Sequence, residues 1–455
     1  LEFRRVLFRS VINLNSGSNI DVSSGESGIG VYVTDSTLNI NDGTITVGKN
    51  GIGVYASNST GTISGGNLNL NGDNAVGYYL TNGSTFNNTG GSISVNGQNI
   101  TLVVTDAGSS LATTNPFTIS ATPGSTYVFG NMIGGDYYNS TSAALGSNGS
   151  LVNGLNSIVL FGTGSNVTSA GNNVSGMVLS GQYASKPFYF SGEGYTAAEE
   201  GTNLGIISLA DSSAGMYLTG GASGRNEGTV SVGKQSVGIY AAGAGAYVVN
   251  NNGIINVGEE STGIFLSDGI RAENLGTAEI NGTGNKAVGI YSENTAAGAV
   301  QITNDNKIDL AGEQSIGIYA SGNHNISNTG NILIGNSSDP DQPGVGIYQD
   351  GIAGSISNTG NINAGDNSIG IYNINGTVTN SGSVTAGNGG TGIYTNGGTL
   401  NLNSGSSIAV GGNNAIGVYA LNQTGTLTNN SAVTIGDSSY GFVFSGSTAP
   451  VFINS

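Results

Sequence analysis

The sequence predicts an all-β fold, a right-handed parallel β-helix with three short strands per coil. A six-residue box recurs along the chain, and apolar residues alternate with Ser, Thr, Asn or Gly over three to five positions between boxes. Self-similarity at a spacing of roughly 20–50 residues indicates a repeat architecture, and alternation is the period of a strand. We expect roughly 17–18 coils, which at ~4.8 Å per coil form a rod of about 80–90 Å.

The box is represented by residues 315–320, SIGIYA, and it organises the rest of the chain. Its aromatic residue returns every 22 to 29 positions between Tyr217 and Tyr419. Because equivalent positions of successive coils stack, we expect these aromatic side chains to form a ladder along the outside of the helix. The ladder residues are Tyr32, Tyr55, Tyr79, Tyr217, Tyr240, Phe265, Tyr291, Tyr319, Tyr348, Tyr372, Tyr394 and Tyr419.

Alternation within the box predicts which side chains face the core. Ile316, Ile318 and Ala320 fall on one face of an ideal strand, while Gly317 and Tyr319 fall on the other. We interpret the aliphatic face as inward, because an aliphatic stripe in water would cost more than an exposed glycine column.

The corners of the predicted coils are rich in Gly and Asn, which tolerate the left-handed backbone conformations of tight bends. An Asn-x-Gly sequence recurs after the second run of each repeat, for example at Asn328, Asn358 and Asn380. We expect these side chains to stack and form amide ladders along the axis. No window has the periodicity of a helix.

The chain divides into four segments. Residues 1–10, LEFRRVLFRS, match a read-through translation of a sequencing-library adapter, so we interpret them as an assembly artefact that is not native. Regular coils are expected over 11–104 and over 206–455, with the last coil truncated. Residues 105–205 are irregular, with possible remnants of the box at 157–161 (SIVLF) and 176–178.

The irregular segment 105–205 is also rich in aromatic residues, and we interpret it as degenerate coils that carry one or two loop excursions. Tyrosines that project from loops can stack on sugar rings or anchor a protein partner. The candidate ligand-binding residues are Tyr137, Tyr138, Tyr189 and Tyr195. The alternative is that these aromatic side chains fill a poorly stacked part of the core.

Composition excludes several classes of partner. The chain has 80 Gly, no Cys and a formal net charge of −17, which argues against nucleic acid because phosphate binding needs basic clusters. No run of 18 apolar residues occurs, so we expect no part of this sequence to be embedded in a membrane as a helix. The absence of cysteine suits a protein that crosses a periplasm, and equally a reduced cytosol.

The GIGVYA and SVGIYA boxes at 51–56 and 236–241, alternating with the Asn-x-Gly runs, resemble the passenger domains of large Gram-negative autotransporter adhesins, a type V secretion family. The resemblance covers 11–104 and 206–445. It implies a cell-surface location and a C-terminal outer-membrane β-barrel beyond this sequence. The chain would then be a fragment of a longer protein. The implied function is a non-enzymatic adhesin or stalk whose receptor is a surface glycan or protein of a host or another bacterium.

Catalytic, cofactor and metal sites are not expected. The single histidine, His324, is predicted to lie in a polar turn, and a zinc site needs several Cys or His ligands. The GxGxxG match at 387–392 is a chance match in so glycine-rich a chain. Asp339 and Asp341 could offer oxygen ligands to calcium, but an ordinary solvated turn is the simpler interpretation.

The alternative function is a β-helix polysaccharide lyase or glycoside hydrolase. Such enzymes need two or three carboxylates that converge on one face. The acidic pairs at 199–200 and 259–260 consist of adjacent residues, which point to opposite faces of a strand. Arg225 and Arg271 have acidic neighbours and are interpreted as surface pairs. We therefore predict that the protein is not an enzyme.

Overall fold

The structure is a computed structural model that describes residues 9–454, except 107, 114–116, 123, 141, 148, 191, 268, 296–297, 352, 424 and 447–450. Residues 1–8 of the adapter-like segment therefore lie outside the described residues. The chain forms two compact units, one of residues 1–210 and 215–222, the other of 211–214 and 223–455. Regular structure among the described residues is β-strand, without a helix that could cross a membrane.

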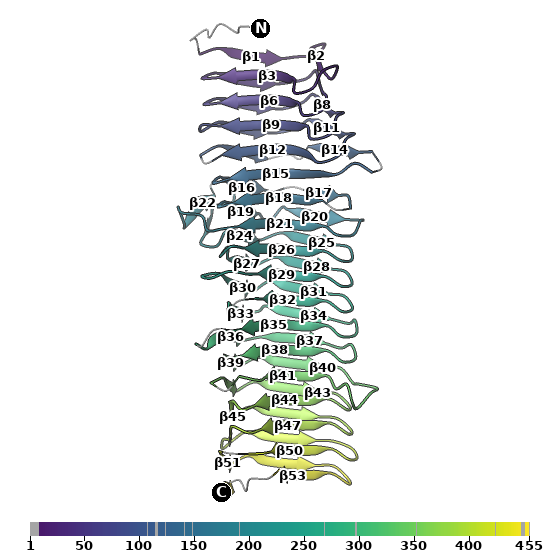
Figure 1. Cartoon of the computed structure of the whole chain (residues 1–455), viewed down its shortest axis with the longest axis vertical. Helices are drawn as coiled ribbons and strands as arrows, with labels where there is room; N and C mark the ends of the chain where they lie inside the picture. Colours follow the sequence, from purple (N-terminus) through teal and green to yellow (C-terminus); the bar gives the residue numbers. More distant parts are fainter. Residues whose placement is uncertain are drawn as a thin grey trace. The chain divides into compact units, whose positions relative to one another are not determined.

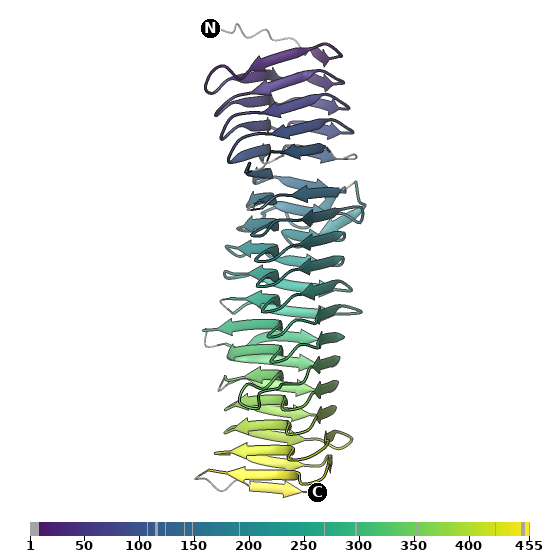
Figure 2. The same cartoon turned by 90° about the vertical axis from the view of Figure 1, so that its right-hand side faces the viewer.

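Both units consist of parallel β-solenoid turns, about 17 in all, with three parallel sheets (Figures 1 and 2). The first sheet contains the boxes. In the first unit its strands are β3 (Ile29–Thr34), β6 (Ile52–Ser57), β9 (Val76–Thr81), β12 (Ile100–Asp106), β15 (Tyr127–Ile133), β18 (Ser150–Leu155), β21 (Ser175–Ser180) and β26 (Ala214–Thr219). In the second unit they are β29 (Val237–Ala241), β32 (Thr262–Leu266), β35 (Val288–Asn294), β38 (Ile316–Gly322), β41 (Val345–Gln349), β44 (Ile369–Ile374), β47 (Thr391–Asn396), β50 (Ile416–Leu421) and β53 (Tyr440–Ser445).

The second sheet follows the box in each turn. In the first unit it contains β1 (Val11–Leu14), β4 (Thr37–Ile40), β7 (Thr60–Ile63), β10 (Thr85–Asn88), β13 (Ser110–Thr113), β16 (Asp136–Asn139), β19 (Ile158–Phe161) and β24 (Gly201–Asn203). In the second unit it contains β27 (Gly224–Asn226), β30 (Tyr247–Asn251), β33 (Arg271–Leu275), β36 (Val300–Asn304), β39 (His324–Asn328), β42 (Ser355–Asn358), β45 (Thr377–Asn380), β48 (Thr399–Leu402), β51 (Thr426–Asn429) and β54 (Val451–Asn454).

The third sheet completes each turn. In the first unit it has two separate parts, one of β2 (Asn19–Val22), β5 (Thr44–Val47), β8 (Asn67–Leu70), β11 (Ser92–Val95) and β14 (Thr118–Ala121), the other of β17 (Ser142–Leu145), β20 (Asn166–Ser169) and β25 (Ile206–Leu209). In the second unit it contains β28 (Thr229–Val232), β31 (Ile254–Val257), β34 (Glu279–Gly282), β37 (Lys307–Leu310), β40 (Asn331–Ile334), β43 (Asn361–Ala364), β46 (Ser383–Ala386), β49 (Ser407–Val410) and β52 (Ala432–Ile435).

The box positions align from turn to turn as the repeat predicts. In the second unit Ile318 pairs with Ile347, and Tyr319 pairs with Tyr348. The corners also agree with the prediction, because most of the non-glycine residues with positive φ in the described part of the chain are asparagines, such as Asn50 and Asn375. The parallel β-helix class predicted from the sequence is confirmed.

The interior of the box differs from the predicted alternation. Ile318 and Ala320 are buried and Tyr319 is half-buried, but Ile316 is only half-buried and Gly317 faces the core. Two consecutive residues, Gly317 and Ile318, therefore face inward, and the pairing of β38 with β41 skips Gly317, which marks a bend in the strand. The prediction that Ile316 is inward and Gly317 outward is wrong.

The inward column of box positions consists of glycines because no larger residue fits there. A Cβ on Gly317 would lie 2.5 Å from the carbonyl oxygen of Gly346 and 2.7 Å from Cγ2 of Ile332. The same relation recurs at Gly263, whose Cβ would lie 2.6 Å from the carbonyl oxygen of Gly289. Aliphatic side chains of the third sheet thus fill the space above each box glycine, and close packing of turns requires glycine there.

A buried asparagine ladder runs along the end of the second sheet in the second unit. Each Nδ2 donates to the Oδ1 of the next turn at 2.7–2.8 Å, and the ladder consists of Asn226, Asn250, Asn274, Asn304, Asn328, Asn358 and Asn380. In most rungs the Nδ2 group also reaches a backbone carbonyl, as that of Asn328 does with Gly330 at 3.2 Å. The predicted amide ladder is confirmed.

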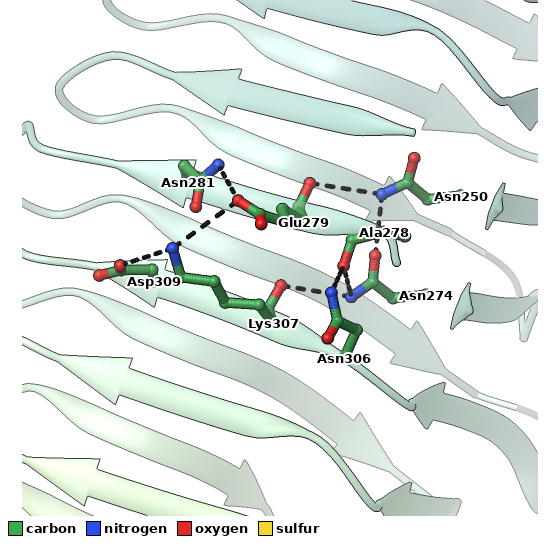
Figure 3. A network of polar contacts seen from close by, with 8 residues as sticks. All are labelled: Asn250, Asn274, Ala278, Glu279, Asn281, Asn306, Lys307 and Asp309. Carbon is green, nitrogen blue, oxygen red and sulfur yellow. Dashed lines mark hydrogen bonds and ion pairs between the residues drawn. The ribbon is translucent and has the colours of Figure 1, made fainter. Parts of the chain in front are cut away.

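Figure 3 shows one segment of this ladder, where Asn250 donates both to Asn274 and to the backbone carbonyl of Glu279. On the outer side of the same turns, Lys307 lies 3.1 Å from Asp309 and 3.7 Å from Glu279. These outer charges are partly exposed and contribute little, about 0–1 kcal/mol per pair. The buried amides, in contrast, must be paired because an unsatisfied group would cost about 1–3 kcal/mol.

The irregular segment 105–205 keeps the three strands per turn. Its box remnant at 176–178 lies in a first-sheet strand, β21, and a Cβ on Gly176 would lie 2.5 Å from the carbonyl oxygen of Gly215. The remnant proposed at 157–161 is wrong, since β19 (Ile158–Phe161) belongs to the second sheet and is buried along its whole length. One hairpin, β22 (Phe188–Phe190) and β23 (Tyr195–Ala197), projects between β21 and β24.

Replacing Ile318 by Asp should lower the free energy of unfolding by about 3–5 kcal/mol, because an unpaired charge would enter the core. Replacing Ile316 by Asp should lower it by about 1 kcal/mol, because this side chain is half-buried. Urea unfolding followed by circular dichroism measures both variants. Equal losses would contradict the bend in the box.

Candidate functional site

The structure separates the four tyrosines that the sequence selects. Tyr137 is only 2% exposed and its ring lies 5.8 Å from that of Phe129. The ring of Phe129 lies 6.3 Å from that of Phe117, and the ring of Phe117 stacks on that of Tyr78 at 5.6 Å. A ligand on the surface cannot reach Tyr137, so the prediction that it binds a ligand is corrected: this side chain fills the core, and burial raises its pKa.

The hairpin carries two of the remaining candidates. β22 and β23 pair antiparallel, with Tyr189 opposite Thr196 and Phe190 opposite Tyr195. Tyr189 is 59% exposed, whereas Tyr195 is half-buried against the turns below. On the inner face of the hairpin, Phe190 and Ala197 form a buried cluster with Ile158 and Leu160 of β19.

Polar contacts hold both ends of the hairpin in place. The hydroxyl of Tyr138 donates to Oε2 of Glu193 at 2.6 Å, and the backbone N–H of Thr163 donates to Oε1 at 2.8 Å. Burial, followed by the hydrogen bond to Glu193, raises the pKa of Tyr138 to about 12. At the base, Nζ of Lys186 lies 2.6 Å from Oε1 of Glu200. The hairpin is therefore a preorganised element, and Tyr138 positions it.

Asp136, Ile158 and Glu200 form one column of equivalent positions in three successive turns, and Glu200 contacts Lys186 at the base of the hairpin. Asp136 pairs with Ile158 in the next turn. Val159 pairs with Gly201 one turn further, so Ile158 is equivalent to Glu200. Asp136 and Glu200 therefore occupy equivalent positions two turns apart. Burial raises the pKa of Asp136 to about 6. The adjacent Glu199 and Glu200 are both buried, which the sequence did not indicate.

The two carboxylates of this column differ in their access to a polysaccharide. Positions two turns apart are separated by ~9.6 Å along the axis, at the limit for an inverting hydrolase. The side chain of Glu200 has no exposed surface and accepts from Lys186 and from the backbone N–H of Tyr183. Of these two equivalent residues only Asp136 is not fully buried.

His324 lies in a different environment from the one predicted. It is the first residue of β39 and is buried, not part of a polar turn. Its Nε2 lies 2.9 Å from Oγ of Ser292, and its Nδ1 lies 3.2 Å from the carbonyl oxygen of Gly322. Burial lowers its pKa. Because Ser292 is also fully buried, this serine–histidine pair cannot meet a substrate.

The aromatic residues of the boxes stack in two series. In the first unit Tyr32, Tyr55 and Tyr79 stack at 5.1 and 5.3 Å. In the second unit the rings from Tyr240 to Tyr419 stack with centroid distances of 4.4–5.5 Å. Ring faces within each series are covered by neighbouring rings, so these side chains stabilise the turns and offer mainly their edges to solvent.

The turn at residues 337–342 is satisfied by its own atoms. The backbone N–H of Asp341 donates to Oδ1 of Asp339 at 2.9 Å, and Oγ of Ser337 donates to the carbonyl oxygen of Asp339 at 2.9 Å. In the described part of the chain, no group of three or more His, Cys, Asp or Glu side chains could hold a metal ion.

Comparison with known proteins shows no family. No protein-family model matches the chain, and no curated protein matches it. The chain is similar to one in the cryo-EM structure of the Vag8–C1 inhibitor complex, with 12% sequence identity and a TM-score of 0.40 over 96% of this chain and 100% of that chain. Both values are too low to indicate a shared family or activity.

Replacing Asp136 by Asn should stabilise the protein at pH 7. The pKa of Asp136 rises from 3.8 to about 6 on folding, so its ionisation lowers the stability of the native protein as pH rises from about 4 to about 6. The variant should therefore gain about 1–3 kcal/mol above pH 6 and lose part of this pH dependence. Thermal melts between pH 3.5 and 7.5 test this, and an unchanged pH profile would contradict it.

Proposed function

We propose that the chain is a non-enzymatic β-solenoid stalk of a cell-surface adhesin, of the autotransporter passenger type, that presents a binding surface to glycans or proteins of other cells. The style of its repeats supports the type, and its net charge of −17 suits an extracellular partner other than nucleic acid. Such a protein would be secreted and tethered to the outer membrane of a Gram-negative bacterium.

The hairpin of β22 and β23 is the observation that carries this proposal. The regular turns expose mainly small polar side chains and the edges of stacked rings, with isolated apolar side chains such as Tyr32 and Ile254. The hairpin instead presents the exposed ring of Tyr189 on an element that Tyr138, Glu193 and the ion pair of Lys186 with Glu200 hold in place. An exposed aromatic ring on a rigid support is the usual anchor of a recognition surface.

Replacing Tyr189 by Ala should weaken attachment of beads coated with the purified protein to target cells by about tenfold, because an exposed anchor is lost while the fold is kept. Tyr32→Ala is the matched control, since Tyr32 is 61% exposed but lies in a regular turn. Equal attachment by the Tyr189 variant and the control would contradict the proposal that the hairpin binds.

The lyase or hydrolase alternative is kept because Asp136 has a pKa suited to a general acid and lies in a column with Glu200. We expect incubation of the protein with polysaccharides to release no reducing or unsaturated ends, since Glu200 is paired and buried. Release of such ends, and its loss in the Asp136→Asn variant, would replace the adhesin proposal with an enzymatic one.

A further inference from the structure

A groove crosses the second sheet of the first unit, over β4, β7, β10 and β13. Its volume is about 440 Å³, which is within the range of sites for small ligands. Thr37, Thr60, Thr85 and Ser110 are paired in register and form one rim. A second column, which contains Asn39 and Thr62, forms the opposite rim two residues further along each strand.

The floor of the groove is set by Gly61, the inward residue of β7. The equivalent inward residues of the neighbouring turns are Leu38 and Phe86. A Cβ on Gly61 would lie 2.5 Å from Cε1 of Phe86, so the ring of the next turn fills the space that a side chain would need. The floor is therefore the backbone of the sheet at Gly61, with the ring of Phe86 buried beneath it, and the rims are polar.

Some hydroxyl groups of the rims are held by hydrogen bonds within the protein, and others are available to a ligand. Oγ1 of Thr37 and Oγ1 of Thr60 are 3.2 Å apart, and Oγ1 of Thr62 donates to Oδ1 of Asn39 at 3.0 Å. The hydroxyls of Thr85 and Ser110, in contrast, have no hydrogen-bond partner among the described residues, so they can bind a ligand without losing a protein contact.

The chemistry of the groove selects the class of ligand. None of the residues that line it is titratable, so it does not favour an anion or a cation. The backbone groups beneath it are used in the parallel sheet, so an extended peptide could not add as a strand. Hydroxyl and amide groups repeat at ~4.8 Å along the axis and ~6.8 Å across it, a pattern that suits a chain of sugar residues with hydroxyls on both sides.

We propose that this groove binds a neutral oligosaccharide that lies along the solenoid axis, with its sugar faces over Gly61 and its hydroxyls against the two rims. The inference deepens the proposed function by naming the ligand class, at a site separate from the hairpin. The two sites can therefore succeed or fail independently.

Isothermal titration of the purified chain with neutral gluco-, galacto- and manno-tetrasaccharides tests the proposal, with oligogalacturonate and a Gly/Ser peptide as comparison probes. At least one neutral tetrasaccharide should bind, and Thr85→Arg should weaken that binding at least about tenfold by placing a long side chain in the groove. Thr377→Arg is the matched control, because Thr377 has the equivalent strand position in β45 of the second unit. The Tyr189→Ala variant should bind the sugar normally.

Binding of none of the neutral tetrasaccharides would overturn the proposal. Equal binding by Thr85→Arg and Thr377→Arg would also overturn it, as would tighter binding of the oligogalacturonate or of the peptide. Sugar binding lost in Tyr189→Ala but kept in Thr85→Arg would place the glycan on the hairpin and leave the proposed function intact without the groove.

Discussion

The structure depends on one constraint: a polar group in the narrow interior needs a partner on a neighbouring turn or on the backbone, and in the ladders that partner is the equivalent residue of the next turn. The asparagine ladder meets this constraint, because an amide has two N–H groups, and Asn328 uses them for Oδ1 of Asn358 and for the carbonyl oxygen of Gly330. Serines meet it at another corner, where the N–H of Ser236 donates to Oγ of Ser261 at 3.0 Å. A turn that slipped by one residue would leave these groups unpaired, so the ladders fix the register.

The narrow interior also explains the glycines of the box. The box glycines leave room for aliphatic methyl groups from the third sheet, as Gly317 does for Cγ2 of Ile332 and Gly370 does for Cγ1 of Val384. Function is then expected where the repeat is interrupted, because a perfect repeat presents one uniform surface. The hairpin after β21 and Gly61 in β7 are two such interruptions, and they carry the two binding proposals.

The fold could be predicted from the sequence because its signal repeats. The box spacing and the Asn-x-Gly corners predict the turns and the ladder that contains Asn328 and Asn358. The bend within the box could not be predicted, since alternation assigns Ile316 and Ile318 to one face and the geometry of a corner does not. Where the repeat fades, neighbours such as Tyr137 and Tyr138 differ in burial and no register indicated which one faces inward.

The candidate site was less predictable than the fold, because its contacts join residues that are distant in the sequence. The segment 105–205 and its aromatic residues could be identified from composition, but the burial of Glu200 depends on Lys186, which the hairpin brings back to the turn. The groove over Gly61 depends on the size of one residue relative to its stacked neighbours. Neither feature has a local sequence signal.

The most direct test of this account compares two asparagines with the same amide–amide contact. Asn328 donates to Asn358 at 2.7 Å inside the core, whereas Asn331 accepts from Asn361 at 2.9 Å on the exposed face. Urea unfolding should show a loss of about 1–3 kcal/mol for Asn328→Ala and less than about 0.5 kcal/mol for Asn331→Ala. Equal losses for the two variants would contradict the claim that the buried ladder holds the turns in register.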